Sequence, residues 1–416
     1  MYSRSVKGFF SFEMIFVLFL YSGALKDTVL LSWIPIDLTI VLLLLNIMTG
    51  LYLLSKNNLK FLLGKYMLIM IILVGCFFTW ALVSVFWSLS GHYALYKLIN
   101  ILVLLGWSFF AGVFIVGSSI ESVKRFFSLV AIFGLLFSMQ FTLLGLEYDQ
   151  SSILQNLSND YIVTSAIIST TLLLFSIYYF MTINKSYIKN IFLILIQLYL
   201  LIIVFSLGAK GPLVALFVSY VVLFLYLAAP QNKSFNFRKT IKYFIYLACI
   251  VSFLLLIDYE QFRVLERFDD LIVNSDTQFD LGGRVWLNLT ALNMWEESPI
   301  TGKGIGSFGL YTYNQDFRAY PHNIFTETMA ELGLIGLIWL IAIFYVTLRM
   351  VPRSDDITFV IPYIVFIFAL IMSQFSGNLS DNRLLFTLLG IVSASSIYLS
   401  KSELIKYGKP TKRNLA

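Results

Sequence analysis

Apolar runs of about 17 to 25 residues recur along the whole chain, and they restrict its fold more than any other feature. A helix of about 20 residues crosses about 30 Å of hydrocarbon, where only helices and closed barrels satisfy every backbone group. The composition agrees, since 59% of the 416 residues are hydrophobic and 12% are charged. The mean hydropathy is +0.85. These values exclude a water-soluble globular enzyme and predict an all-α polytopic membrane protein.

The runs predict about twelve transmembrane helices. They lie near residues 9–25, 29–54, 66–90, 93–117, 126–146, 160–183, 191–207, 211–229, 243–257, 324–348, 359–376 and 383–399. The first run keeps Glu13 and has no small-residue cleavage site after it, so we interpret it as a retained helix and not as a signal peptide. An even number of spans places both termini on one side of the membrane.

The basic residues are distributed unequally between the connections. With the N-terminus inside, 20 of the 29 Lys and Arg residues fall on the cytoplasmic side. The opposite connections hold most of the acidic residues, including Asp27, Glu147, Asp149, Asp160 and Asp381. This asymmetry follows the positive-inside rule and predicts that both termini are cytoplasmic. The net charge of +6 is not gathered on one polar face, as a nucleic-acid partner would require.

One connection, residues 258–322, is far longer than the others and is predicted to lie outside. A loop of this length among tight turns is a candidate for function. Apolar residues repeat at helical spacing in 262–271 and in 285–295, which predicts two amphipathic helices along the membrane surface. The predicted units are nine membrane helices in 1–257, the outer loop in 258–322, three membrane helices in 323–400 and a basic cytoplasmic tail in 401–416.

Some basic residues lie on the predicted outer face, where the charge rule does not require them. They are Lys210, Arg263, Arg267, Arg284, Lys303, Arg318 and Arg383. Lys210 stands in a short turn between two apolar runs, where a lysine that snorkels from a helix end is the alternative explanation. Arg284 begins a predicted helix, where a cation opposes the helix dipole. A phosphate at that helix start would explain Arg284, and a lipid headgroup is the alternative.

The two histidines both fall at the predicted outer boundary. His322 stands in Pro321-His322-Asn323, directly before an apolar helix that carries Glu327 and Glu331. An imidazole there titrates near neutral pH and can accept a proton from a hydroxyl. The alternative is a structural residue at the start of a helix, beside an Asn N-cap. We interpret His92 as an ordinary turn residue.

Three further patterns in the sequence bear on chemistry. The glycine-rich run 299–308 does not follow a strand and faces outward, so we expect it to turn tightly and approach a ligand through its backbone rather than bind a nucleotide. Cys76 and Cys249 lie inside apolar runs, and no carboxylate and histidine set has metal-ligand spacing. Asp37 and Lys97 lie near the outer ends of their spans, and we expect a structural ion pair between them.

Three stretches, in this order on the predicted outer face, resemble the O-antigen ligase and polymerase family. They are Ser206-Leu-Gly-Ala-Lys210-Gly-Pro-Leu-Val-Ala-Leu, Gly283-Arg284-Val-Trp286 running on to 299–308, and Pro321-His322-Asn323 followed by Glu331-Leu-Gly333-Leu-Ile-Gly336. With the segment 84–88, the resemblance covers residues 80 to 340. It implies a bacterial inner-membrane glycosyltransferase with about twelve spans, a periplasmic active site and an undecaprenyl-diphosphate-linked donor. It implies no cofactor and no required metal.

Roles for single residues follow from this resemblance alone. It makes Arg284 a diphosphate-binding residue and His322 the general base on the acceptor hydroxyl. Lys210 stands where family members usually carry Arg, and it offers a point charge in place of a bidentate fork. Arg318, Asn323, Glu327 and Glu331 would support them.

The resemblance also implies the reaction and the partners. The reaction is a single displacement with inversion at the anomeric carbon. The partners are the lipid-linked oligosaccharide donor, a glycan acceptor on a lipid-linked repeat unit or lipid A-core, membrane lipid and a chain-length regulator, with no nucleic acid.

Two activities of the family remain open, and a third class is less favoured. Only 13 residues separate Phe308 from His322, and this compact segment favours a polymerase over a ligase that transfers polymer to lipid A-core. A polysaccharide transporter or flippase is the more distant alternative. Such folds commonly divide into two halves of six helices and place ionisable residues at mid-bilayer.

Overall fold

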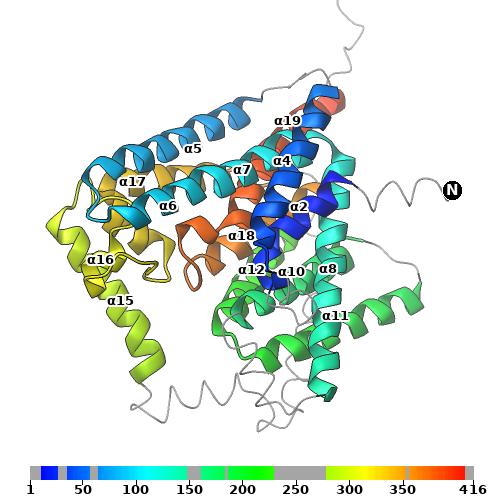
Figure 1. The fold of residues 1–416 in the computed structure, drawn as a ribbon. Coiled ribbons are helices and arrows are strands. Elements are labelled where there is room, and N and C mark those ends of the chain that lie inside the picture. Colours follow the sequence, from blue (N-terminus) through cyan, green and yellow to red (C-terminus); the bar gives the residue numbers. More distant parts are fainter. Residues whose placement is uncertain are drawn as a thin grey trace, which may run out of the picture.

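The described part of the chain is entirely helical (Figure 1). The computed structural model describes residues 11–26, 35–56, 64–147, 161–182, 186–228, 278–352 and 356–407. The α-helices are α2 (Phe12–Leu20), α3 (Ser22–Lys26), α4 (Leu38–Lys56), α5 (Lys65–Val83), α6 (His92–Asn100), α7 (Gly106–Phe114), α8 (Ile120–Glu147), α10 (Tyr161–Met181), α11 (Tyr187–Leu207), α12 (Lys210–Ala228), α15 (Gln278–Glu297), α16 (Phe308–Tyr313), α17 (Ile324–Leu348), α18 (Ile357–Met372) and α19 (Arg383–Tyr407). Short turns of other helix types are η1 (Ser84–Trp87), η2 (Ile101–Leu105), η3 (Val116–Ser118) and η5 (Leu379–Asp381). The all-α prediction is confirmed.

Eight helical segments are long and apolar enough to cross a membrane. They are Leu38–Lys56, Lys65–Trp87, Tyr93–Ser118, Ile120–Leu143, Tyr161–Met181, Tyr187–Leu207, Lys210–Ala228 and Ile324–Leu348. Two shorter apolar helices, Ile357–Met372 and Arg383–Ser395, coincide with the last two predicted spans. The first predicted span is divided at Tyr21 into α2 and α3. The predicted span 243–257, the amphipathic segment 262–271 with Arg263 and Arg267, and the end of the basic tail lie outside the described residues.

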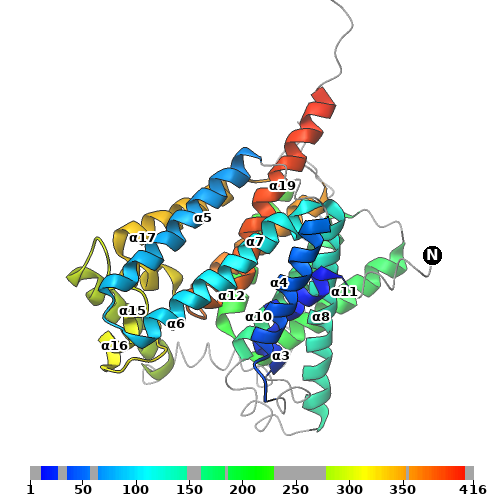
Figure 2. The same cartoon turned by 45° about the horizontal axis from the view of Figure 1, so that its top comes forward.

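The helices form a bundle that joins sequence neighbours and also helices far apart in the chain. α19 packs against α7, α5 and α18, while α10 packs against α8, α11, α12 and α18. α5 and α17 lie side by side with α6 at one end of the molecule, and α15 and α16 lie beyond their ends (Figures 1 and 2). The C-terminal end of α19 projects from the bundle in Figure 2.

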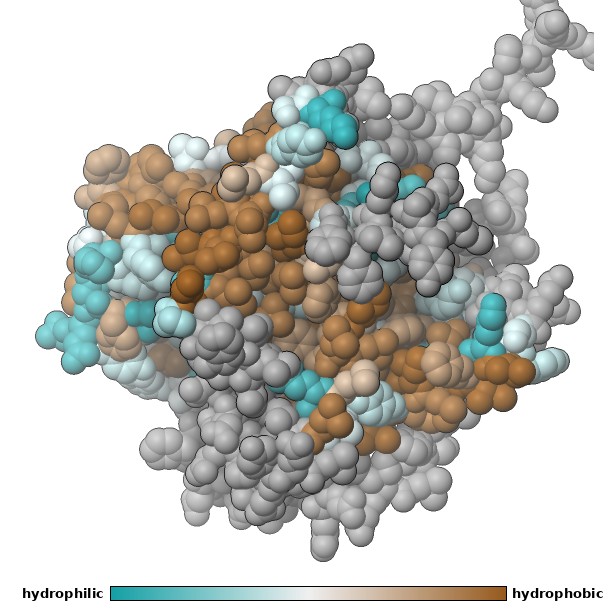
Figure 3. Space-filling view, turned by 45° about the vertical axis from the view of Figure 1, so that its right-hand side comes forward, coloured by the Kyte–Doolittle hydropathy of each residue, from teal (hydrophilic) through white to brown (hydrophobic). Residues whose placement is uncertain are grey.

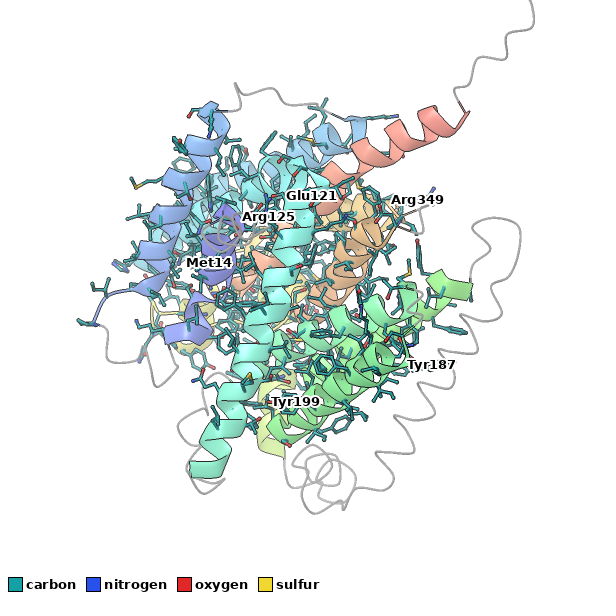
Figure 4. The ribbon with its side chains drawn as sticks, turned by 90° about the vertical axis from the view of Figure 1, so that its right-hand side faces the viewer. Met14, Glu121, Arg125, Tyr187, Tyr199 and Arg349 are labelled. Carbon is teal, nitrogen blue, oxygen red and sulfur yellow. The ribbon has the colours of Figure 1, made fainter. Side chains whose placement is uncertain are left out.

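The outer surface of the bundle is largely apolar, as a helix in lipid requires. Figure 3 shows broad hydrophobic areas over one side of the molecule, and Met48, Tyr187 and Phe217 are among the exposed large side chains. Polar contacts lie between the helices instead. In Figure 4 α8 runs from the top of the view to its lower left, and the label of Arg125 stands near that of Met14 of α2. Arg125 Nη2 lies 2.9 Å from Glu13 Oε1.

Helix α17 breaks at Gly333, whose φ of 65° and ψ of −165° are not helical. Such angles are open essentially to glycine alone. The backbone groups released by the break bind the run 299–304 and a tryptophan. The bonds are Lys303 N to Ala330 O (3.0 Å), Gly304 N to Glu331 O (2.9 Å), Leu334 N to Pro299 O (2.9 Å), Ile335 N to Ile300 O (3.3 Å) and Trp80 Nε1 to Leu332 O (2.8 Å). A break in a membrane helix is tolerated when other groups of the protein satisfy it in this way.

The glycine-rich run therefore approaches the protein itself. Gly302, Gly304 and Gly306 all have positive φ, so the prediction of tight turns is confirmed. A β-carbon on Gly302 would overlap the backbone of Glu331, and one on Gly304 would overlap that of Ser88. The expectation of a backbone-first approach to a ligand is wrong at these two glycines, because α17 and the η1 region fill that space.

Lys97 of α6 is held between two glutamates of α17. Its Nζ lies 2.5 Å from Glu327 Oε1 and 2.6 Å from Glu331 Oε2, and the three side chains are at most 1% exposed. The predicted pair between Asp37 and Lys97 is wrong. The Asp37 carboxylate instead accepts the backbone N–H of Thr39 at 2.8 Å. Glu327 also accepts the backbone N–H of Leu379 through Oε2 at 2.8 Å, so the cluster joins α6, α17 and η5.

We expect replacement of Lys97 to lower the free energy of unfolding far more than replacement of an exposed lysine does. Lys97→Met leaves two carboxylates buried without their cation, and breaking a buried pair in this way costs about 3–5 kcal/mol of unfolding free energy. Lys124, which is half exposed and 3.9 Å from Glu121, is the matched control, and its change to Met should cost under about 1 kcal/mol. Denaturant titration of the purified protein in detergent measures both. Equal losses would contradict a stabilising role for the buried cluster.

Candidate functional site

Arg284, Arg318 and the start of α12, which carries Lys210, meet around the connection between α18 and α19, residues 373–382. Arg284 Nη1 of α15 donates to Phe375 O at 3.3 Å. Lys210 is the first residue of α12, and its neighbour Gly211 faces Phe375 so closely that a β-carbon would lie 2.8 Å from the Phe375 Cβ. The structure thus brings Arg284 and the start of α12 to one segment, although about 70 residues of sequence separate them.

Residues before α17 reach the same connection from another side. Ile324 N donates to Ser373 O at 3.1 Å, and Arg318 Nη2 lies 2.8 Å from Asp381 Oδ2. Residues 373–382 were not predicted to belong to the site, apart from the charge of Asp381. The polar run Ser376-Gly-Asn-Leu-Ser-Asp-Asn382 between two apolar spans was the available signal.

His322 directly precedes the N-cap of α17 and has an unusual backbone conformation. Its φ of 61° is left-handed, which is uncommon for any residue other than glycine and is concentrated at functional sites. Asn323 is the N-cap of α17, and its Oδ1 accepts the N–H groups of Phe325 at 2.9 Å and Thr326 at 3.2 Å. The N-cap therefore fixes the start of the helix and leaves the imidazole outside it.

Asn288 holds α15 against this turn and was missed by the sequence analysis. Its Nδ2 donates to Arg284 O at 2.8 Å and to Pro321 O at 3.0 Å, while its Oδ1 accepts from Thr326 Oγ1 at 2.7 Å. Asn288 lies one helical turn after Arg284, and this spacing places both on one face of α15. A single amide thereby sets the position of the arginine relative to the histidine.

The imidazole of His322 lies in a partly buried, cationic environment. Burial lowers the pKa of His322, and the charges of Arg284 and Arg318 lower it further against the opposing effect of Asp381. The ring of Tyr320 lies 4.5 Å from that of His322 between centroids. A lowered pKa keeps the imidazole neutral at pH 7, the state in which a histidine accepts a proton.

Arg318 is half exposed and faces both a carboxylate and a ring. Besides its contact with Asp381, its guanidinium lies 5.5 Å from the centroid of the Tyr320 ring, within the range of a cation–π contact. Among the residues that the structure describes, no three His, Cys, Asp or Glu side chains are grouped so that they could hold a metal ion.

Glu327 and Glu331 lie inside the bundle, one and two turns along α17 from Asn323, and not in the site. Both are buried with Lys97, so they support α17 rather than face a substrate. His92 also stands apart from His322, as the first residue of α6. Its backbone N–H donates to Asp316 Oδ2 at 2.8 Å. Burial acts to raise the pKa of Asp316, but hydrogen bonds from Ser90 and from the start of α6 lower it overall.

Comparison with known proteins supports the resemblance seen in the sequence. A family model described as O-antigen ligase matches residues 192–341, a range that includes Lys210, Arg284, Arg318, His322 and Asn323. No curated protein matches the chain. The segment 84–88 lies outside the matched range, yet it contacts the glycine-rich run, since Ser88 Oγ donates to Ile305 O at 2.8 Å.

Proposed function

Since residues 192–341 match the O-antigen ligase family, we propose that this protein is a membrane glycosyltransferase. It transfers a glycan from undecaprenyl diphosphate to a sugar hydroxyl on the periplasmic face of the bacterial inner membrane. One observation carries the proposal: Arg284 and the neutral His322 lie together in the matched segment, at one connection of the bundle. A cation and a base side by side are what this transfer requires.

Arg284 and Lys210 form the donor side of the site. A sugar that departs from diphosphate leaves negative charge on the phosphate oxygens, and fixed cations stabilise that charge as it develops. The Arg284 guanidinium offers a planar fork to two oxygens, whereas Lys210 adds a point charge. Helix α15 begins at Gln278, so the prediction that Arg284 stands at a helix start is wrong. Arg284 lies in the second turn of α15 and donates to Phe375 O.

His322 forms the acceptor side and completes a single displacement. The acceptor oxygen forms a bond to the anomeric carbon while the bond from that carbon to the diphosphate oxygen breaks. The hydroxyl proton passes to the imidazole, and undecaprenyl diphosphate departs with the electron pair. Attack opposite the leaving group inverts the anomeric carbon, and no metal is needed for this balance.

Polymerase and ligase differ only in the acceptor. The connection from α16 to α17 is short, and Asp316 ties it to α6, which leaves a compact segment and favours a polymerase that extends a lipid-linked repeat unit. The description of the matching family favours the ligase, which transfers polymer to lipid A-core. A knockout glycan profile separates them, because loss of a polymerase leaves single repeats on the core and loss of a ligase accumulates lipid-linked polymer.

The topology of the proposal places about twelve spans in the membrane, with both termini cytoplasmic and residues 258–322 in the periplasm. We expect a cysteine introduced between residues 272 and 280 to react with an impermeant maleimide from outside, and one placed after Lys239 to stay protected until the cell is lysed. The background carries Cys76→Ser and Cys249→Ser. Labelling of the first position only from the cytoplasm would contradict both the orientation and the catalytic assignment.

Arg284 should be far more sensitive to replacement than Lys210. We expect Arg284→Ala to lower transfer by about 10²- to 10³-fold, as for loss of one transition-state donor, and Arg284→Lys to recover part of it. Lys210→Arg should be tolerated, because Arg is usual at this place in the family. Transfer from purified lipid-linked donor measures the effect, with Lys189→Ala as the control. Normal turnover by Arg284→Ala at normal membrane levels would remove this residue from the site.

Loss of the imidazole should nearly abolish transfer. We expect His322→Ala and His322→Gln each to lower the rate by about 10²- to 10⁴-fold with donor binding retained, and His92→Ala to have little effect. The base acts when neutral, so the rate should hold as the pH falls through 6.5 and be lost only below the lowered pKa of His322. Asp381→Asn removes a charge that raises this pKa and should move the acid limb lower, whereas Arg318→Gln should move it higher. An unshifted pH–rate profile in both variants would assign the acid limb to another group.

A further inference from the structure

Three aromatic side chains beside the site are exposed and touch one another. Trp286 of α15, Tyr313 of α16 and Phe317 are 49%, 44% and 42% exposed. The rings of Trp286 and Tyr313 lie 6.0 Å apart between centroids, and those of Tyr313 and Phe317 lie 5.5 Å apart. We call these three residues the aromatic patch. Trp286 lies 27 residues before Tyr313, so its contact with the other two rings is a result of the fold.

A short segment of chain connects the aromatic patch to His322. Phe317 is followed directly by Arg318, whose guanidinium lies over the Tyr320 ring, and the Tyr320 ring contacts His322. Five residues of sequence therefore separate the aromatic patch from the imidazole. This segment follows α16, whereas Arg284 contacts Phe375 in the connection between α18 and α19.

Polar groups border the aromatic patch and distinguish it from the lipid-facing surface. Asn314, Gln315 and Asp316 lie between Tyr313 and Phe317 in sequence and are all exposed. Asn314 is left-handed, with φ 54°, and Asp316 is fixed to Ser90 by a 2.6 Å hydrogen bond. Exposed backbone turns and a carboxylate are not placed in hydrocarbon. The aromatic patch therefore suits a ligand with apolar faces and polar edges.

We propose that the aromatic patch binds pyranose rings of the acceptor glycan and directs its terminal hydroxyl to His322. A pyranose carries C–H groups on its faces and hydroxyls on its rim. The faces match the negatively polarised ring surfaces of Trp, Tyr and Phe, and the rim matches the polar border. The proposal rests on the glycosyltransferase function proposed above. It assigns the acceptor to this side because Tyr320, three residues after Phe317 of the aromatic patch, contacts the base His322.

The test separates ring stacking from simple apolar anchoring. Transfer is measured for the full protein in nanodiscs, with saturating lipid-linked donor and with the bacterium's own repeat-unit oligosaccharide, released by mild acid, as the varied acceptor. We expect Trp286→Leu, Tyr313→Leu and Phe317→Leu each to raise KM for the acceptor about 3- to 10-fold, with kcat within about twofold. Trp286→Phe and Tyr313→Phe should stay close to the parent, because they keep a ring.

Leu289 provides the matched control. It lies on the same exposed face of α15 as Trp286 and is itself exposed, but it has no ring. Leu289→Ala should leave KM unchanged. If Leu289→Ala raises KM as much as Trp286→Leu does, or if the three Leu variants behave like the parent, the aromatic patch is a membrane anchor and the proposal is overturned. Thermal unfolding of each variant is measured beside the kinetics. If an α15 variant does not fold, the KM of Phe317→Leu tests the proposal instead, because Phe317 lies in an exposed turn.

A binding measurement separates failure of this proposal from failure of the proposed function. The released oligosaccharide is titrated into the parent and into Trp286→Leu in nanodiscs, and calorimetry gives both affinities. Weaker binding by the variant supports the aromatic patch even if the parent transfers no glycan, a result that would overturn only the glycosyltransferase function. Equal binding by parent and variant, or no binding by either, overturns the aromatic patch as a glycan site.

Discussion

The contact of Lys97 with Glu327 and Glu331 is the interaction on which the site depends. Charges buried this deeply in an apolar bundle persist only when they are paired and otherwise hydrogen-bonded. The pairing therefore fixes α6 against the first two turns of α17, and Glu327 extends it to η5 through the N–H of Leu379. His322, Asp381 and the N-cap Asn323 stand at the ends of the elements that this cluster holds together.

Periodicity predicted most of the described helices, and motif order predicted the candidate site residues. Neither predicted which helices and side chains contact one another. Arg284 and His322 were assigned roles from the resemblance; His322 does precede the N-cap of α17, but Arg284 lies in the second turn of α15 and not at its start. The partner of Lys97 was assigned to Asp37, since sequence gives depth along a helix and not the face that meets a neighbour. Asn288 and Phe375 were missed for a related reason. They act through an amide and a backbone carbonyl, which any polar helix position or loop residue could offer.

The connection between α18 and α19 shows how tertiary structure completes the site. Its backbone accepts from Arg284 and Ile324, and Asp381 binds Arg318. At its far end Arg383 donates to Phe19 O at 2.8 Å and to Ser22 Oγ at 2.9 Å, where α2 ends and α3 begins. One short segment therefore joins the site to the first helices of the chain, which supply no residue to the chemistry.

The break at Gly333 divides α17 into two lengths with different surroundings. The length before Gly333 carries Glu327 and Glu331, whereas the length from Leu334 onward exposes Ile338, Ile341 and Tyr345. The run 299–304 is hydrogen-bonded to both lengths where they meet. A change in bilayer thickness acts on a helix through its lipid-exposed apolar side chains, and the second length carries these three. We therefore expect such a change to tilt the second length more than the first, which leads to His322.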